Sequence, residues 1–350
     1  MHSPSTDELV LPMSDKSGWP WTKETVPLPD GSPWPKITIV TPSFNQGEYI
    51  EETIRSVLLQ GYPNLEYIII DGGSTDDSVA IIKKYEPWLT FWTSGPDQGQ
   101  SQAINKGFEH ATGNILGYIN SDDLYEPGAL FVAAESFSGQ TGIHLLAGQC
   151  VVFNDQGVKR IFQPWWPAKP AYYVSRTYSS TFAQPASFWS RSAFQELGGF
   201  DETLHCCFDR EFFLRMGLAG IKPMFISQVL ARFREHNASK SMTREISFHR
   251  ESLAILDKHA TACGISEGHK RRIARRLRME IDYINVFDNW RNHGRLAALV
   301  DFSRMIRRFP PALCERKILG QARRLLFFRK KSVAELVLGT DIRETKHDAV

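Results

Sequence analysis

Residues 36–44 read KITIVTPSF, residues 66–73 read EYIIIDGG and residues 114–123 read NILGYINSDD. Each stretch is a short apolar, β-branched run that ends in turn-forming or polar residues, which predicts a strand. The connecting segments have the apolar spacing of helices, over 48–61, 75–86 and 99–113. Continuously apolar strands that alternate with helices indicate parallel βαβ units. The sequence therefore predicts an α/β fold with a Rossmann-like, mostly parallel sheet flanked by helices.

Polar, acidic and glycine residues follow each predicted strand. In parallel sheets, ligands bind beyond the carboxyl ends of the strands, so these residues are expected on one rim. They form four groups: Pro42-Ser43-Phe44-Asn45, Asp71-Gly72-Gly73-Ser74, Gly95-Pro96-Asp97-Gln98 and Asn120-Ser121-Asp122-Asp123. Adjacent carboxylates repel each other unless a cation or hydrogen-bond donors satisfy them. Asp122 and Asp123 thus fit Mg²⁺ or Mn²⁺ beside a substrate phosphate, or simply a helix cap.

The composition excludes several protein classes. The 350 residues are 42% hydrophobic and 23% charged, which rules out collagen-like, coiled-coil and wholly disordered chains. No apolar run reaches the ~18–20 residues of a membrane span, and the N-terminus does not resemble a signal peptide. The five cysteines include the adjacent Cys206 and Cys207, an arrangement that favours reduced thiols. A cytoplasmic location is expected.

Charge divides the chain. Residues 244–350 contain 23 Lys and Arg against 13 Asp and Glu, whereas residues 1–243 are net acidic. Residues 1–35, rich in proline and tryptophan, predict an extended arm, and the basic segment predicts a helical C-terminal extension. This extension could pack on the body, form a subunit contact, or make peripheral contact with an anionic membrane. No recognisable nucleic-acid-binding module is present.

Three further features lie between residues 145 and 236. Residues 145–162 predict a hairpin, and an aromatic-rich stretch follows, whose members suit either sugar stacking or core packing: Trp165, Trp166, Tyr172, Tyr173 and Trp189. Asp209 and Glu211 begin a predicted helix, where a two-residue step turns about 200°, so only one can face a pocket. That residue could be a general base or a helix cap, and His236 a metal ligand or a surface histidine.

Seven segments in this order resemble the family 2 glycosyltransferases, from about Lys36 to Lys240: TPSFNQGEYIEETIRSVLLQ, IIIDGGSTDDS, GPDQGQSQAINKGF, GYINSDDLYEPGAL, FWSRSAFQELGGFDE, FDREFFLRM and FREHNAS. The resemblance implies a GT-A-type fold over residues 36–243. It also implies an inverting enzyme that uses a nucleotide-diphosphate sugar, with a UDP-sugar favoured, and a glycan or lipid-linked acceptor, as in surface polysaccharide synthesis.

The resemblance also implies residue roles. Pro42 and Phe44 would border the nucleotide base, Asp71 the nucleoside, and Asp97 and Gln102 the nucleotide or donor sugar. Asp122 would lie near the ribose and diphosphate. Asp123 would bind the Mn²⁺ or Mg²⁺ ion, with His236 near it, and Asp209 would be the catalytic base.

Two positions depart from the family pattern. Gly72 replaces a second acidic residue, and Asn120 stands where relatives often carry Asp. Two alternative functions use similar folds: a sugar nucleotidyltransferase and a non-catalytic nucleotide-sugar-binding module. The first usually needs a basic, glycine-rich loop after the first strand, which is absent here, and the acidic residues with His236 disfavour the second.

Overall fold

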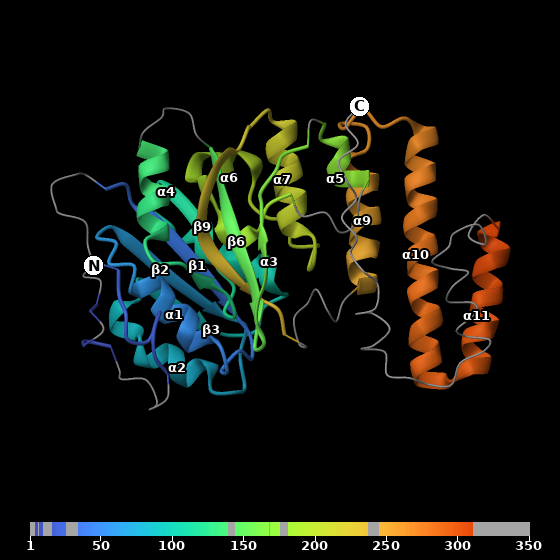
Figure 1. Cartoon of the computed structure of the whole chain (residues 1–350). Coiled ribbons are helices and arrows are strands. Elements are labelled where there is room, and N and C mark those ends of the chain that lie inside the picture. The colour runs from blue at the N-terminus through green and yellow to red at the C-terminus, as the bar shows by residue number, and fades with distance from the viewer. Residues whose placement is uncertain are drawn as a thin grey trace. The chain divides into compact units, whose positions relative to one another are not determined.

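The computed structural model describes residues 4–5, 7–9, 16–25, 34–138, 144–167, 169–175, 181–236 and 245–310. Its described strands form one nine-stranded sheet in the order β3-β2-β1-β4-β8-β6-β9-β5, with β7 paired to β6 (Figure 1). The parallel half contains β1 (Ile37–Ser43), β2 (Leu65–Asp71), β3 (Phe91–Ser94) and β4 (Ile115–Tyr118). The predicted parallel βαβ units are confirmed.

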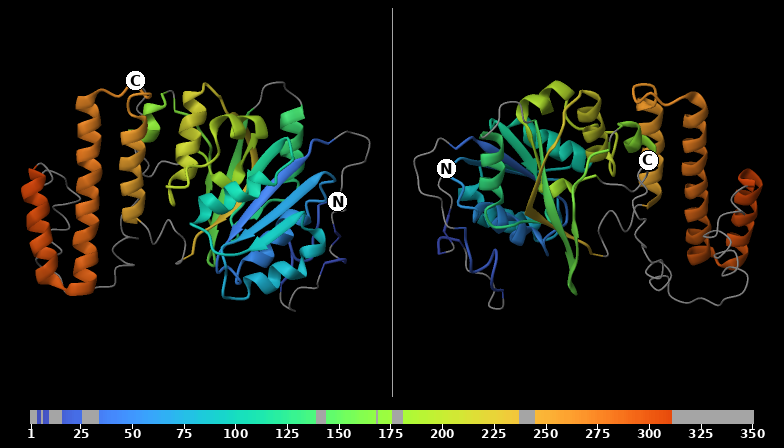
Figure 2. Two further views of the ribbon diagram at one scale, coloured as in Figure 1. Left: turned by 180° about the vertical axis from the view of Figure 1, so that it is seen from behind. Right: turned by 45° about the horizontal axis from the view of Figure 1, so that its top comes forward.

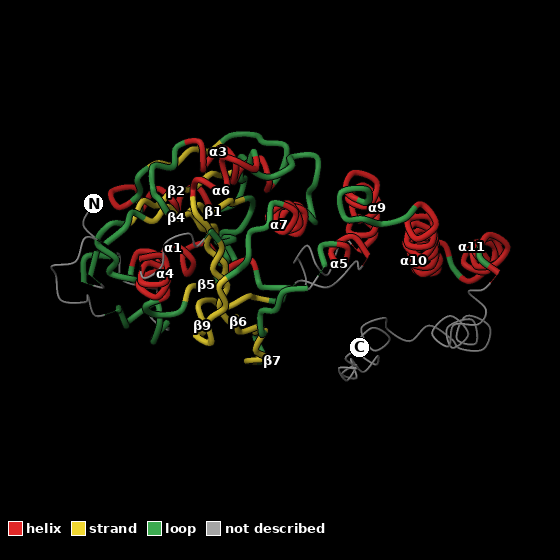
Figure 3. Tube along the Cα trace, turned by 90° about the horizontal axis from the view of Figure 1, so that it is seen from above, coloured by secondary structure: helices red, strands yellow, loops and turns green. Residues whose placement is uncertain are grey.

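Helices cover both faces of this parallel half. The chain passes from β1 through α1 (Ile50–Leu58) to β2, through α2 (Ser78–Lys84) to β3, and through α3 (Gln100–Glu109) to β4. Figure 3 shows α1 and α4 (Ala129–Ser138) across the sheet from α3. Fully buried Ile37, Ile39 and Ile69 belong to the core beneath α1 and α2. Strands buried on both faces explain why β1 and β2 are continuously apolar.

The other half of the sheet is mixed. It contains β5 (Leu124–Tyr125), β6 (Leu145–Asn154), β7 (Gly157–Phe162), β8 (Ser187–Ser190) and β9 (Met224–Arg234). The predicted hairpin is β6–β7, and β6 and β9 lie side by side along their length (Figure 2). A short helix α5 (Ala171–Ser175), α6 (Arg191–Leu197) and α7 (Phe208–Leu218) complete this region, with 3-10 turns at Glu86–Trp88 and Gln184–Ala186.

The chain divides into two compact units, Met1–Ile273 and Ala274–Val350. Helix α9 (Glu245–His259) belongs to the first unit, α10 (Glu267–His293) crosses the division, and α11 (Arg295–Arg308) belongs to the second. The predicted boundary at 243/244 lies outside the described residues and stays a prediction. Residues 311–350 of the predicted basic segment also lie outside the described residues. None of the described helices has the length and apolar character needed to cross a bilayer.

The described parts of the N-terminal arm are anchored. Leu9 and Trp21 are buried, and the fully buried Arg55 of α1 donates hydrogen bonds to the Pro20 and Trp21 carbonyl oxygens at 3.0 and 2.9 Å. A buried guanidinium needs such acceptors, because an unpaired buried charge is costly. These contacts tie the arm to α1.

Candidate active site

The carboxyl ends of the first three strands meet at one edge of the sheet. Ser43 lies opposite Asp71, and Asp71 lies opposite Ser94. The Gly72 amide donates to the Ser43 carbonyl oxygen at 2.8 Å, which carries the pairing beyond the strands. The predicted rim is therefore present, and three of its four groups lie next to one another.

Asp71 builds the turn after β2. It is 1% exposed, and its carboxylate accepts hydrogen bonds from the Gly73 and Ser74 amides at 3.1 and 2.8 Å. The Ser74 and Ser94 hydroxyls donate to the same carboxylate at 2.5 and 2.7 Å. A carboxylate with four donors has little remaining capacity for a ligand. Asp71 therefore holds the turn after β2 together, with its side chain turned inward.

The space beside Gly72 belongs to Asp97. A Cβ atom at position 72 would lie 2.9 Å from Asp97 Oδ2, while Asp97 Oδ1 accepts from the Gly99 amide at 2.8 Å. Gln102 accepts from the Gln98 amide at 2.9 Å and so closes the same loop. The Asp97 carboxylate therefore occupies the space that the side chain of a second acidic residue at position 72 would need. This gives a physical reason for glycine at position 72.

The residues after β1 differ in accessibility. Pro42 is buried within the strand, whereas the Phe44 side chain is 59% exposed at the rim. The Ser43 hydroxyl between them is buried and has no hydrogen-bond partner among the described residues. Phe44 thus offers a free aromatic face and Ser43 a free hydroxyl, while Pro42 supports the strand.

Asp122 and Asp123 have different surroundings. Asp123 is fully buried, and its carboxylate accepts from the Arg234 amide at 2.9 Å and the Asn120 side-chain amide at 3.1 Å. Burial and the neighbouring Asp122 charge raise the pKa of Asp123 well above its ordinary value. The Asp122 side chain is 19% exposed, and its Oδ2 lies 2.9 Å from His236 Nε2. Asp122, not Asp123, therefore shares an accessible position with His236.

Arg234, which the sequence analysis did not single out, fixes this pair. Its guanidinium donates to the Asp122 carbonyl oxygen at 3.0 Å and to Glu52 of α1 at 2.7 Å. It also lies over the Tyr49 ring, which in turn contacts the His236 ring at a centroid distance of 4.8 Å. Because Arg234 ends β9 and β9 pairs with β5, it brings His236 to residues more than 110 positions earlier. Spacing along the chain alone could not reveal this role.

Asp209 lies at the second residue of α7, near the end of β4. Its carboxylate accepts from the Arg210 amide at 2.7 Å, and it is half-buried. Desolvation raises its pKa, although Arg210 partly opposes this shift. Burial and the charges of Asp209 and Asp123 raise the pKa of Tyr118, and the Tyr118 ring lies 6.1 Å from that of Phe208. Asp209 and Asp123 therefore both lie near Tyr118, at the end of β4.

Glu211 points the other way. Its carboxylate is fully buried and binds Arg215 at 2.8 Å, His259 at 2.8 Å and Lys258 at 3.1 Å. Desolvation opposes ionisation, but the His259 and Arg215 interactions prevail and lower the pKa of Glu211. As the helical rotation predicts, only Asp209 of the two acids faces the strand end.

The aromatic stretch is partly core. Trp189 is fully buried and Tyr173 is 2% exposed, so packing accounts for both. Trp166 stacks on Phe182 at 5.7 Å. Trp165, 39% exposed, forms an edge-to-face pair with Tyr172 at 4.8 Å. Of these five aromatic residues, Trp165 is the most exposed, and Trp166 and Tyr172 are partly buried.

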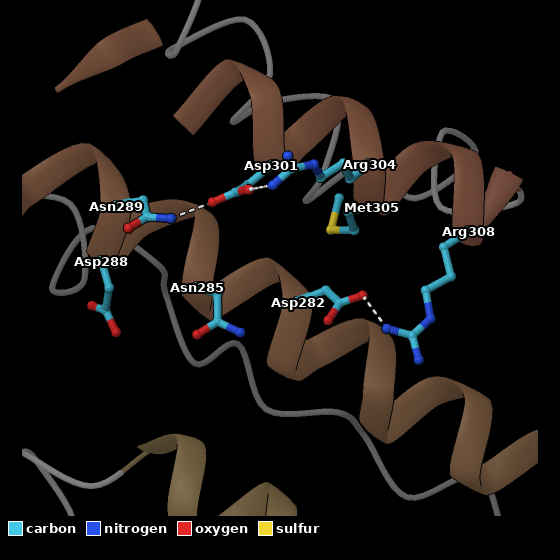
Figure 4. Close-up of a pocket in the computed structure, with 8 residues that line it drawn as sticks. All are labelled: Asp282, Asn285, Asp288, Asn289, Asp301, Arg304, Met305 and Arg308. Carbon is cyan, nitrogen blue, oxygen red and sulfur yellow. Dashed lines mark hydrogen bonds and ion pairs between the residues drawn. The ribbon is translucent and has the colours of Figure 1, made fainter. Parts of the chain in front are cut away.

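The second unit has a pocket of about 410 Å³ between α10 and α11 (Figure 4). Its acidic residues are paired: Asp282 with Arg308 at 3.1 Å, and Asp301 with Arg304 at 3.1 Å and with Asn289. No group of three or more metal-binding side chains occurs anywhere among the described residues. The pocket's acids thus have partners already, and the candidate site remains at the strand ends.

Comparison with known proteins identifies the family of the chain. Residues 38–198 match the sequence profile of Glycosyl transferase family 2. An uncharacterized glycosyltransferase from Mycobacterium tuberculosis (strain H37Rv) is 31% identical over 226 residues, covering 63% of this chain and 80% of that protein. The chain belongs to glycosyl transferase family 2. It is a glycosyltransferase, as its resemblance implied.

Solved structures confirm the fold of this family 2 glycosyltransferase. Residues 1–349 of TarS from S. aureus, in complex with UDP-GlcNAc, have a TM-score of 0.53 at 15% identity, covering 78% of this chain and 81% of that fragment. The mannosyltransferase PcManGT of Pyrobaculum calidifontis, in complex with GDP-Man and Mn²⁺, has a TM-score of 0.52 at 18% identity, covering 88% and 85%. The GT-A-type fold predicted for the chain is thereby confirmed.

Proposed function

We propose that this glycosyltransferase moves a sugar from a nucleotide-diphosphate donor to an acceptor hydroxyl with inversion at the anomeric carbon. The observation that carries this proposal is that Asp209, at the start of α7, and Asp123, just after β4, both lie close enough to Tyr118 at the end of β4 for their charges to raise its pKa. A leaving diphosphate and an incoming hydroxyl need separate groups on either side of the transferred sugar. These acids provide them from separate elements.

Asp209 is the proposed general base. Its desolvated carboxylate has a raised pKa, so it holds a proton more strongly than a solvated aspartate does. Its position at the start of α7 keeps the ionised form available, because helix N-termini stabilise anions. The carboxylate would take the proton of the acceptor hydroxyl as that oxygen attacks, which is typically worth ~10²–10⁴-fold in rate.

Asp122 and His236 are the proposed holders of Mn²⁺ or Mg²⁺. An oxygen and a nitrogen ligand 2.9 Å apart, partly accessible, fit an ion whose remaining ligands come from the diphosphate and water. When bound, such an ion supplies charge stabilisation to the leaving diphosphate. Asp123 instead holds Asn120 and the Arg234 backbone in place, so the expected ligand shifts by one residue.

The donor is proposed to lie along the rim, with its base on Phe44. A UDP-sugar is favoured, and the bound UDP-GlcNAc of TarS supports this, while the GDP-Man of PcManGT makes GDP-sugars the main competitor. The acceptor is proposed to be a glycan or lipid-linked glycan of a surface polysaccharide. The exposed Trp165–Tyr172 pair supports a sugar acceptor, because aromatic faces pack against pyranose rings.

A donor screen tests the proposal. UDP-, GDP- and dTDP-sugars are incubated with the full chain and Mn²⁺, and release of nucleotide diphosphate is measured with and without glycan acceptors. We expect one nucleotide class to be consumed and the product to have the opposite anomeric configuration by NMR. Formation of a nucleoside triphosphate and a sugar 1-phosphate when pyrophosphate is added, or a product of retained configuration, would overturn the proposal. The exposed Glu135 of α4 gives a matched control, Glu135→Gln, which should leave turnover unchanged.

A further inference from the structure

Helix α9 lies beyond the segment that matches the family profile, yet it holds the start of α7. The Glu251 carboxylate of α9 accepts hydrogen bonds from three consecutive backbone amides, those of His205, Cys206 and Cys207, at 3.0, 2.8 and 2.8 Å. Cys207 is the N-cap of α7 and its side chain does not cap the helix. Glu251 therefore anchors the three residues that lead into α7, the last of which is its N-cap residue.

Further contacts prevent α9 from shifting relative to α7. Arg210 donates to the Ser252 hydroxyl at 2.7 Å, and Glu211 binds Lys258 and His259 at 3.1 and 2.8 Å. Arg210 and Glu211 are consecutive residues of α7, and they bind α9 at separate places along its length. These contacts therefore fix the rotation of α7 about its axis as well as its position. The direction in which Asp209 points is set by that rotation.

Glu251 also acts on Asp209 through charge. Arg210 of α7 lowers the pKa of Asp209, and Glu251 of α9 raises it. The Asp209 charge in turn raises the pKa of Cys207, before the helix, and of Tyr118, at the end of β4. Two carboxylates at one helix N-terminus compete for the same positive end of the dipole. Glu251 is therefore expected to oppose ionisation of Asp209, and Arg210 to favour it.

We propose that Glu251 is a positioning residue for the catalytic base: it sets the orientation of Asp209 by binding, from α9, the three backbone amides that lead into α7. This inference rests on the proposed function of Asp209. It makes α9 a part of the active site, so a fragment that ends between α7 and α9 would keep Asp209 but lack the residue that positions it.

The variant Glu251→Gln tests the proposal in the full chain. Both carboxylate oxygens accept hydrogen bonds, whereas a glutamine offers one acceptor and turns an NH₂ group toward a backbone amide. We expect kcat to fall about 10- to 100-fold, as for a base moved by about 1 Å, while KM for the donor changes less than about twofold. The acidic limb of the pH–kcat profile should move to lower pH, because the neighbouring negative charge is gone.

Two other variants separate positioning from general stability. Glu251→Asp keeps the charge but shortens the reach, so kcat should fall while the acidic limb stays in place. Asp257→Asn alters a 64%-exposed acid on the same helix and should behave as wild type. Thermal melts identify any variant that fails to fold.

The outcomes distinguish this inference from the proposed function. If wild type transfers sugar and Asp209→Asn is inactive, but Glu251→Gln keeps wild-type kcat and an unmoved acidic limb, the positioning role is overturned and the proposed function stands. If kcat of Glu251→Gln falls but the acidic limb of its pH–kcat profile does not move, the expected effect of the Glu251 charge on the Asp209 pKa is contradicted. If Asp209→Asn keeps its activity, the assignment of the base fails first.

Discussion

The rim of strand ends and the α7–α9 region use opposite means to place acidic groups. At the rim, each group follows its own strand within a few residues, and short contacts such as Asp71 with Ser74 complete it locally. In the α7–α9 region, Asp209 depends on partners about 40 residues later, including Glu251 and Ser252. The comparison teaches that the turn after β2 is built largely from local contacts, whereas the start of α7, like the Asp122–His236 pair, depends on packing between distant elements.

The largest expected effect concerns the base. Asp209→Asn removes the proton acceptor but keeps the size of the side chain, so transfer should fall by about 10²–10⁴-fold while nucleotide binding is nearly unchanged. Initial-rate kinetics and calorimetric titration with the nucleotide measure the two quantities. Equal losses in binding and turnover would place Asp209 on the donor side and break the comparison.

The second effect separates the two rim acids. Asp122→Asn and His236→Ala should each weaken Mn²⁺-dependent nucleotide binding by on the order of 100-fold. Loss of a residue that only supports a metal ligand costs up to about 100-fold, and loss of a direct ligand should cost at least as much. Asp123→Asn should weaken Mn²⁺-dependent nucleotide binding less, because the buried Asp123 carboxyl group already binds Asn120 and the Arg234 amide. Calorimetry with and without Mn²⁺ compares them. A larger loss for Asp123→Asn than for Asp122→Asn would restore Asp123 as the ligand.

The third effect is on stability. Glu211→Gln leaves the cations of Arg215 and Lys258 without their buried partner, which should cost about 3 kcal/mol of unfolding free energy. Because the pKa of Glu211 is lowered in the folded protein, its contribution is complete above its ordinary pKa of 4.5 and disappears as pH falls through the folded value. Urea unfolding of wild type and variant should therefore converge at acidic pH. A constant difference across pH 3–7 would contradict this.

The smallest effect concerns the local geometry of the rim. Gly72→Asp restores the family's second acid but brings its Cβ to 2.9 Å from Asp97 Oδ2, so donor affinity should fall about tenfold, or ~1.4 kcal/mol. Gly72→Ala adds the contact without the charge and should cost less. Adding Asp97→Asn to Gly72→Asp should recover part of the loss, since the like-charge repulsion disappears. Tighter binding by Gly72→Asp alone would show that Asp97 does not hold that space.

Sequence patterns predicted the features that are determined by residues close together along the chain. Alternating apolar strands and helices gave the parallel half of the sheet, and the polar residues after β1, β2 and β4 marked its functional edge. The 200° rotation between Asp209 and Glu211 also held, because it follows from helix geometry alone.

Long-range partners were beyond the same reasoning. Asp123 was expected to bind metal, but its burial depends on Arg234, which β9 brings from more than 100 residues away. Asp71 is predicted to lie at the nucleoside pocket, and that position stays a prediction; what spacing could not give is that Ser74 and Ser94 turn its carboxylate inward. A motif gives the identity of an acid, whereas the direction of its side chain depends on neighbours from other elements.

A crystal structure of the full chain with its donor nucleotide and Mn²⁺, phased to show the anomalous signal of manganese, tests the central claim most directly. The account predicts a manganese peak bound by Asp122 and His236, with the diphosphate beside it and the Asp209 carboxylate across the sugar position from it. A peak on Asp123, or an Asp209 side chain turned away from the nucleotide, would contradict the account.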